Sequence, residues 1–166
     1  IETGTFCVAA CLTKGNLLIK GFNPALIQTE LNLLKKTGAK IKMYKDQIQI
    51  KGPKKIKKIN HIITKEYEGF PTDLQSQFMV LLCKANGISS ITENIFKSRF
   101  MHAMELQRLG AKIIIKGSKA IIEGNTNFIG AEVMSSDLRA SAALVLAAIS
   151  AKGTSIVSRV YHCDRG

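Results

Sequence analysis

The sequence has no long apolar run, and its cysteines and histidines are few. The longest apolar run, Ala140 to Ala151, is too short to span a bilayer, and no signal peptide is visible. No Cys-x-x-Cys pair occurs, and the histidines lack metal-ligand spacing, which argues against a zinc site and a disulfide framework. We therefore expect a cytoplasmic protein that does not contact a membrane and holds no metal or cofactor. The cysteines are interpreted as small buried apolar residues: Cys7, Cys11, Cys83 and Cys163.

Acidic residues are also scarce: the chain has 12 acidic and 24 basic residues, which gives a net charge of +12. Such a charge raises nucleic acid as a partner. However, the densest basic run, Lys51–Lys58, is broken by Gly52 and Pro53 and has no aromatic residue on which a base could stack. We interpret it as a solvated turn and expect no nucleic-acid partner. A non-catalytic basic module that binds RNA or a protein through this run stays open as the alternative.

The chain is long enough for one sizeable core. It has 166 residues, of which 46% are hydrophobic. It begins at Ile1 without a methionine and stops directly after a strand-like run. We therefore expect one domain, residues 1–166, cut from a longer polypeptide.

Apolar periodicity, glycines and prolines predict alternating helices and strands. The expected helices are 2–13, 24–38, 74–86, 101–109 and 138–151. The expected strands are 16–20, 39–44, 47–51, 60–64, 89–94, 111–116, 120–123, 133–135 and 154–160. Helix 138–151 is apolar on nearly all faces, so we expect it to be buried among sheets.

Glycine spacing reveals an internal repeat. Gly15, Gly38 and Gly52 are 23 and 14 residues apart, and so are Gly87, Gly110 and Gly124, after a shift of 72. The repeats run approximately over 1–58, 59–130 and 131–166, the last one truncated. The fold class is therefore α/β, with βαβαββ-like units whose helices lie in the centre and whose sheets lie outside.

The stretch Glu66–Phe78 carries the first candidate for chemistry. Gly69 and Pro71 stop the preceding strand, and Thr72 and Asp73 then offer side-chain oxygens to the free N–H groups of the next helix. Such a helix start also favours anions. Asp73 is thus either a helix cap or part of a site for a charged substrate. Ser136–Ala140 repeats this pattern at the third unit, with an aspartate at position 137.

Four motifs resemble those of the UDP-N-acetylglucosamine enolpyruvyl transferase (1-carboxyvinyltransferase) family, in the same order and across the whole chain. They are Phe70-Pro71-Thr72-Asp73-Leu74-Gln75-x-Gln77-Phe78-Met79, Arg99-Phe100-Met101-His102, Asp137-Leu138-Arg139-Ala140-Ser141-Ala142 and Tyr161-His162-x-Asp164-Arg165-Gly166. The resemblance implies one inside-out α/β barrel of a two-domain enzyme. It also implies transfer of the enolpyruvyl group of phosphoenolpyruvate to the 3′-hydroxyl of UDP-N-acetylglucosamine, which releases phosphate and begins peptidoglycan synthesis. The shikimate-pathway sister enzyme shares the fold but not these motifs.

The resemblance also implies roles for individual residues. Asp73 matches the aspartate that contacts the sugar hydroxyl and is proposed to transfer its proton, and Arg165 matches an arginine that engages phosphoenolpyruvate. Ile95 matches an aliphatic position whose backbone contacts the UDP-sugar, and Phe96 is taken as its neighbour in substrate binding. Lys97-Ser98 stands where the family usually has Glu-Asn.

Three further charged residues, Arg99, Asp137 and Arg139, match positions around the cleft between the two domains. They orient either substrate or one another, as an ion-pair network at helix starts does. The family's loop with its reactive cysteine belongs to the other domain, the expected partner of this chain. We therefore expect that none of the cysteines here is catalytic and that the 166-residue chain alone is inactive.

Overall fold

The computed structural model describes residues 1–96 and 99–161, and its elements follow the predicted order. The helices are α1 (Glu2–Thr13), α2 (Gln28–Lys36), α3 (Gln75–Cys83), α4 (His102–Arg108) and α5 (Leu138–Ile149), with 3-10 turns η1 (Pro24–Ile27) and η2 (Thr72–Leu74). The strands are β1 (Asn16–Lys20), β2 (Lys40–Met43), β3 (Gln47–Lys51), β4 (Ile62–Ile63), β5 (Ile88–Thr92), β6 (Lys112–Lys116), β7 (Lys119–Glu123), β8 (Glu132–Met134) and β9 (Ile156–Ser158). None of the helices in the described ranges has the length and apolar character that crossing a bilayer requires.

The strands form three separate sheets. The first sheet has the order β1-β3-β2, the second β4-β5-β7-β6, and the third consists of β8 and β9. Leu17 pairs with Ile50 in the first sheet, and Ser89 pairs with Ile122 in the second, so both partners are shifted by 72 residues. The first two sheets therefore share one antiparallel register, whereas the boundaries of the predicted repeats stay a prediction.

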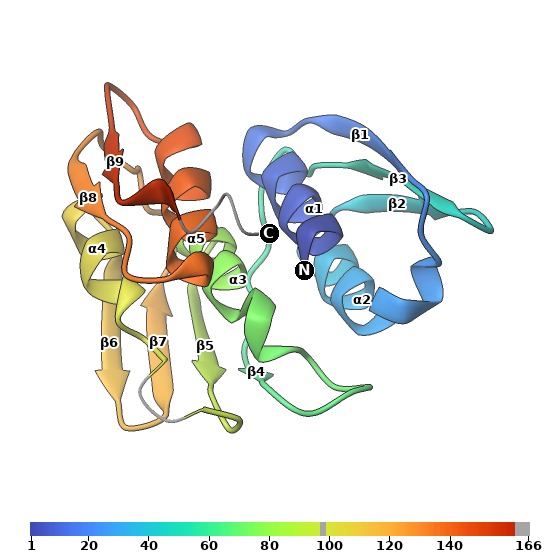
Figure 1. Ribbon diagram of the computed structural model, residues 1–166, viewed down its shortest axis with the longest axis horizontal. Helices are drawn as coiled ribbons and strands as arrows, with labels where there is room; N and C mark the ends of the chain where they lie inside the picture. Colours follow the sequence, from blue (N-terminus) through green and yellow to red (C-terminus); the bar gives the residue numbers. More distant parts are fainter. Residues whose placement is uncertain (97–98, 162–166) are drawn as a thin grey trace.

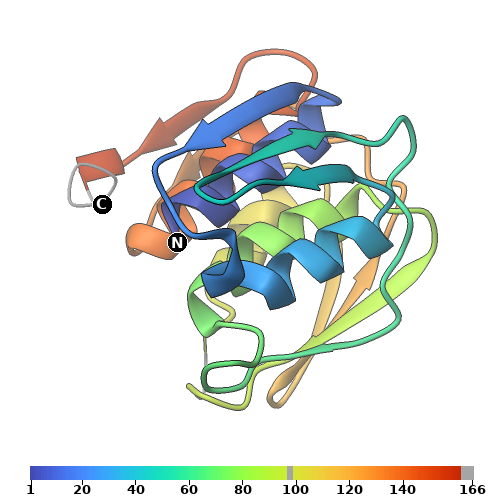
Figure 2. The ribbon, with the colours of Figure 1, turned by 90° about the vertical axis from the view of Figure 1, so that its right-hand side faces the viewer.

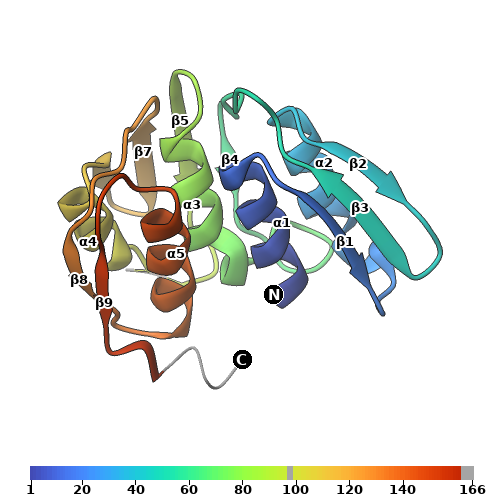
Figure 3. The same ribbon diagram turned by 90° about the horizontal axis from the view of Figure 1, so that it is seen from above.

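The helices lie in the centre and the sheets outside, which confirms the predicted α/β arrangement (Figures 1 and 2). Seen from above, α1, α3 and α5 stand side by side between the first and third sheets (Figure 3). All nine residues of α3 are buried, including the polar Gln75, Ser76 and Gln77. Burial of each large apolar side chain of this helix stabilises the fold by about 1.5–3 kcal/mol.

Helix α5, which was expected to be buried among sheets, is partly open on one side. Ala142 and Val145 are only half-buried, and Ile149 is 59% exposed. Periodicity reports that a face is apolar, but it does not report whether another element covers that face. On this side the described residues leave a groove of about 330 Å³, here called the α1–α5 groove. It is lined by Ile1, Glu2, Thr5, Phe6, Gln77, Leu138, Arg139 and Ala142.

The basic run Lys51–Lys58 connects the first sheet to the second. Lys54 and Lys55 are exposed, whereas Pro53 and Ile56 are buried against the helices. The run is therefore a turn with solvated lysines held by apolar anchors, as predicted. The N–H of Gly52 donates to Gly15 O at 2.8 Å. This bond closes the first sheet against the end of α1.

Candidate functional site

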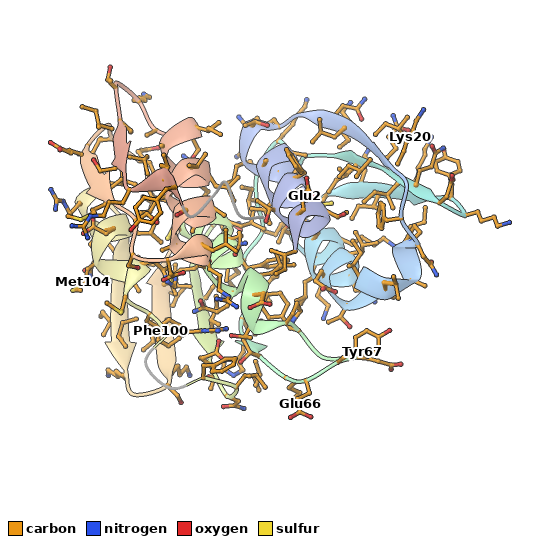
Figure 4. The ribbon with its side chains drawn as sticks, in the orientation of Figure 1. Glu2, Lys20, Glu66, Tyr67, Phe100 and Met104 are labelled. Atoms are coloured by element: carbon orange, nitrogen blue, oxygen red, sulfur yellow. The ribbon has the colours of Figure 1, made fainter. Side chains whose placement is uncertain are left out.

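The first turns of α3 and α5 lie side by side and bring together residues that are far apart in the sequence. Ser76 in α3 donates to the carbonyl of Arg139 in α5 at 3.1 Å. Asp73 lies just before α3, in η2, and Arg99 lies in the segment between β5 and α4. The loop from β4 to η2 carries Glu66 and Tyr67 at its solvent-facing tip (Figure 4). The site therefore depends on the packing of α3 against α5.

The prediction that Thr72 and Asp73 cap a helix is wrong. Neither side chain accepts from a backbone N–H at the start of η2 or of α3. Backbone carbonyls fill this role, because Leu74 N donates to Pro71 O at 3.2 Å and Gln75 N donates to Thr72 O. The carboxylate of Asp73 is thereby left for side-chain partners.

Two arginines bind Asp73 through a single oxygen. Arg139 approaches Asp73 Oδ1 with Nε at 2.6 Å and Nη2 at 2.5 Å, and Arg99 Nη1 lies 3.5 Å from the same atom. All three side chains are partly exposed, between 23% and 33%. Among residues 1–96 and 99–161, no partner contacts Asp73 Oδ2 or Arg139 Nη1. An incoming hydroxyl and an incoming anion thus find a free acceptor and a free donor close together.

Asp137 is a helix cap rather than a fourth member of the cluster formed by Asp73, Arg99 and Arg139. Its Oδ1 accepts from Arg139 N at 2.9 Å and from Ala140 N at 3.0 Å, and Ser136 donates to Oδ2 at 3.0 Å. Burial raises the pKa of the Asp137 carboxyl, but these hydrogen bonds and nearby His102 outweigh burial, so that the pKa lies below its usual range. The Asp137 carboxylate fixes the first turn of α5 and, with it, the backbone of Arg139.

Phe96 and Ile95 lie next to the ion-pair cluster. The guanidinium of Arg99 lies over the Phe96 ring, with Cζ 3.8 Å from the ring centroid. Such cation–π contacts are favourable and also restrict the orientation of the arginine. Ile95 N donates to Glu93 Oε1 at 2.9 Å. The structure therefore brings Asp73, Arg99, Arg139, Phe96 and Ile95 together, whereas Arg165 lies outside the described residues.

The sequence analysis missed the buried carboxylate of Glu93. It is 2% exposed and follows β5 directly. Thr72 donates to its Oε2 at 2.9 Å and Thr64 to its Oε1 at 2.8 Å. A signal was present, because side chains two apart in a strand share a face and Glu93 follows buried Ile91 by two positions.

The described cysteines and histidines supply neither a nucleophile nor a metal site here. Burial raises the pKa values of the Cys7, Cys11 and Cys83 thiols to about 12, which leaves them as poor nucleophiles. This confirms their interpretation as buried apolar residues, while Cys163 lies outside the described ranges. No group of three or more potential ligands among His, Cys, Asp and Glu is close enough to hold a metal in the described part of the chain.

Comparison with known proteins gives matches over the whole chain. A family model described as EPSP synthase (3-phosphoshikimate 1-carboxyvinyltransferase) matches residues 1–166. Two relatives named UDP-N-acetylglucosamine 1-carboxyvinyltransferase, from Pelagibacter ubique (strain HTCC1062) and Desulfosudis oleivorans (strain DSM 6200 / JCM 39069 / Hxd3), are 60% and 51% identical over 166 residues. They match 100% of this chain, but the chain spans only 40% of each relative.

Solved structures agree with this assignment at the level of fold. The enolpyruvyl transferase NikO from Streptomyces tendae superposes with a TM-score of 0.91 and 25% identity, over 99% of this chain and 39% of that one. EPSP synthase from Acinetobacter baumannii gives a TM-score of 0.75 at 21% identity, over 97% of this chain and 41% of that one, and so supports the fold alone. The chain belongs to the EPSP synthase (3-phosphoshikimate 1-carboxyvinyltransferase) family.

Proposed function

We propose that this chain is one part of a two-domain UDP-N-acetylglucosamine 1-carboxyvinyltransferase. The enzyme moves the enolpyruvyl group of phosphoenolpyruvate to the 3′-hydroxyl of UDP-N-acetylglucosamine and releases phosphate. The choice of acceptor is supported by relatives of that name that are 60% and 51% identical to the chain. The other domain, the two substrates, the cytoplasm and a place in peptidoglycan synthesis belong to the same proposal.

The observation that carries the chemistry is the Asp73 carboxylate, which is held through Oδ1 and has no partner at Oδ2 within residues 1–96 and 99–161. Its anchoring by Arg139 at 2.5 and 2.6 Å fixes the direction of the second oxygen. In our proposal, Oδ2 accepts the hydroxyl proton while the sugar oxygen bonds to C2 of phosphoenolpyruvate; the bond from C2 to the phosphate oxygen then breaks, and phosphate leaves with the proton. A positioned base of this kind is worth about 10²–10⁴ in rate.

The arginines serve the charged groups of the substrates. The planar donor fork of a guanidinium matches a carboxylate or a phosphate, and Arg139 Nη1 remains for such a group. In the proposal Arg99 acts beside it, Arg165 engages phosphoenolpyruvate, and Ile95 and Phe96 contact the UDP-sugar. Asp137 contributes by orienting Arg139 through the first turn of α5.

The test is phosphate release by the complete polypeptide that contains this chain, with phosphoenolpyruvate and UDP-N-acetylglucosamine as substrates. We expect Asp73→Asn to lower kcat by about 10²–10⁴-fold, because the amide cannot accept the proton. Asp46→Asn is the matched control, since Asp46 is exposed in the turn between β2 and β3 and should leave the rate unchanged.

Each outcome of this assay decides a separate point. Equal rates for wild type and Asp73→Asn would remove Asp73 from the chemistry. Turnover with shikimate 3-phosphate instead of the UDP-sugar would replace the acceptor. The isolated 166-residue chain is expected to be inactive, and measurable turnover by it would contradict the need for the second domain.

A further inference from the structure

Glu93 is a buried carboxylate that has no cationic partner among residues 1–96 and 99–161. Only 2% of it is exposed, and the described residues that contact its side chain are neutral donors. Its Oε1 accepts from Thr64 Oγ1 at 2.8 Å, from Ile95 N at 2.9 Å and from Phe96 N at 3.1 Å. Burying a carboxylate is unfavourable unless such bonds compensate it. A buried group with this many partners restrains the segments that supply them.

One set of contacts runs from Glu93 to Arg99 through a hydroxyl. Thr72 Oγ1 donates its single proton to Glu93 Oε2 at 2.9 Å, so that its lone pairs are left to accept. Arg99 Nη1 donates to Thr72 Oγ1 at 2.8 Å and also lies 3.5 Å from Asp73 Oδ1. Glu93 therefore sets the direction of the hydroxyl that holds Arg99 beside Asp73.

A second set of contacts reaches Arg99 through the backbone. The N–H groups of Ile95 and Phe96 both point at Glu93 Oε1 and bend the chain after β5 into a tight turn. This turn places the Phe96 ring under the Arg99 guanidinium at 3.8 Å. Both sets of contacts therefore act on the Arg99 guanidinium, one through the Thr72 hydroxyl and the other through the Phe96 ring.

We propose that Glu93 is a positioning residue that orients Arg99 toward an anionic substrate group, a phosphate or a carboxylate, and also shapes the Ile95–Phe96 backbone. It does not touch the reacting atoms. This inference rests on the proposed function for the identity of the substrate, whereas the two sets of contacts are observed directly in the structure. A misplacement of such a group by about 1 Å can lower the rate by about 10²-fold.

A double-mutant cycle in the complete polypeptide separates positioning from folding. We expect Glu93→Gln, which keeps the size of the side chain, to lower kcat/KM by about 10–100-fold. In the Arg99→Ala background the same change should cost clearly less than in wild type, because only the part of the effect that acts through the Ile95–Phe96 backbone then remains. Glu123→Gln is the control, since Glu123 is exposed and pairs with Lys112 in the same sheet.

The inference is overturned if Glu93→Gln retains the wild-type rate, or if its loss is as large in the Arg99→Ala background as in wild type. Should Glu93→Gln fail to fold, Thr72→Val takes its place in the cycle, because it removes only the hydroxyl that joins Glu93 to Arg99.

Backbone amide exchange supplies a readout that needs no substrate. Exchange at Ile95 and Phe96 should be at least tenfold faster in Glu93→Ala, which removes the oxygen that accepts both N–H groups, than in wild type, and it should be unchanged in Glu123→Ala. Slow exchange in both variants overturns the inference. If the wild-type polypeptide shows no turnover, the proposed function fails, and this measurement still decides whether Glu93 holds the segment.

Discussion

At the scale of single residues, the imidazole of His102 couples stability to pH. Its side chain is 5% exposed at the start of α4, and Nε2 has no hydrogen-bond partner in the described ranges. Burial lowers the pKa of His102 from 6.5 to about 4, although the charge of Asp137 opposes this shift. The unfolded chain therefore takes up the proton first as the pH falls.

We expect the free energy of unfolding to be highest above pH 6.5 and to fall as the pH drops from about 6.5 to about 4. The loss should be about 3 kcal/mol, because each unit of difference between the unfolded and folded pKa of His102 corresponds to about 1.36 kcal/mol. Asp137 acts in the same direction but at still lower pH, because its pKa lies below 3.8. Urea unfolding of His102→Gln at pH 7, 5.5 and 4 should show this loss largely abolished. Identical curves for wild type and His102→Gln would contradict the prediction.

The residues of the site could be named from the sequence, but their contacts could not. Motif resemblance singled out Asp73, Arg99 and Arg139, and the structure places them together. Local chemistry left Asp73 open between a helix cap and part of a site, and arginines 26 and 66 positions away bind the carboxylate. Asp137 was grouped with the arginines and turned out to be the cap. Partners brought in by tertiary packing leave no local trace in the sequence.

At the scale of the elements, glycines fix how closely the segments after β3 and β7 approach the helices. The N–H of Gly124 donates to Gly87 O at 3.0 Å, as the N–H of Gly52 does to Gly15 O. A Cβ on Gly124 would lie 1.9 Å from Ala85 O, and one on Gly52 would lie 2.1 Å from Ala10 O. These neighbours are backbone atoms, which cannot rotate away.

We expect Gly124→Ala to destabilise the chain by about 2–3 kcal/mol, because the backbone must shift to admit the methyl group. Gly117→Ala is the comparison, since Gly117 has a φ of 56° and nothing within 4 Å, and should cost only about 1 kcal/mol for its left-handed conformation. Chemical denaturation of both variants measures the difference. Equal losses would mean that conformation, and not close approach, determines the cost at Gly124.

Most elements were predictable because periodicity and glycines mark them. The first three strands are 16–20, 40–43 and 47–51, against predictions of 16–20, 39–44 and 47–51. The strand predicted at 60–64 is a continuous strand only at Ile62–Ile63, where it pairs with β5, while Thr64 forms an isolated bridge with Phe70. The helix predicted at 74–86 is shorter, Gln75–Cys83, with η2 before it. Hydrogen bonds to distant segments set these limits.

At the scale of the whole molecule, the α1–α5 groove leaves apolar side chains in water. Phe6 is 51% exposed and Ile1 is 60% exposed, and both line the groove. We expect the isolated chain to self-associate through this groove, because apolar surface is removed from water when copies meet. Sedimentation velocity over a concentration series should show dimers or larger species.

The variant Phe6→Ser should shift this equilibrium toward the monomer. Leu26→Ser is the matched control, because Leu26 is 61% exposed in η1, away from the groove, and should leave self-association unchanged. A wild-type chain that sediments as a monomer at the highest concentration would contradict the prediction.

The two arginines on Asp73 also link ligand affinity to the completeness of assembly. Asp73 is held between the second sheet and α3, whereas Arg139 arrives with α5, so that their ion pair exists only in molecules whose α5 has docked. Molecules with a detached α5 would retain the first two sheets but would not bind the anionic group of the substrate, because Arg139 would be absent from the site. By mass action, the anion would then draw them into the docked state, to an extent set by its concentration relative to Kd. Titration with the anionic ligand would thus measure the fraction of molecules whose α5 is docked. Spectroscopy of secondary structure would report the same preparation as uniform.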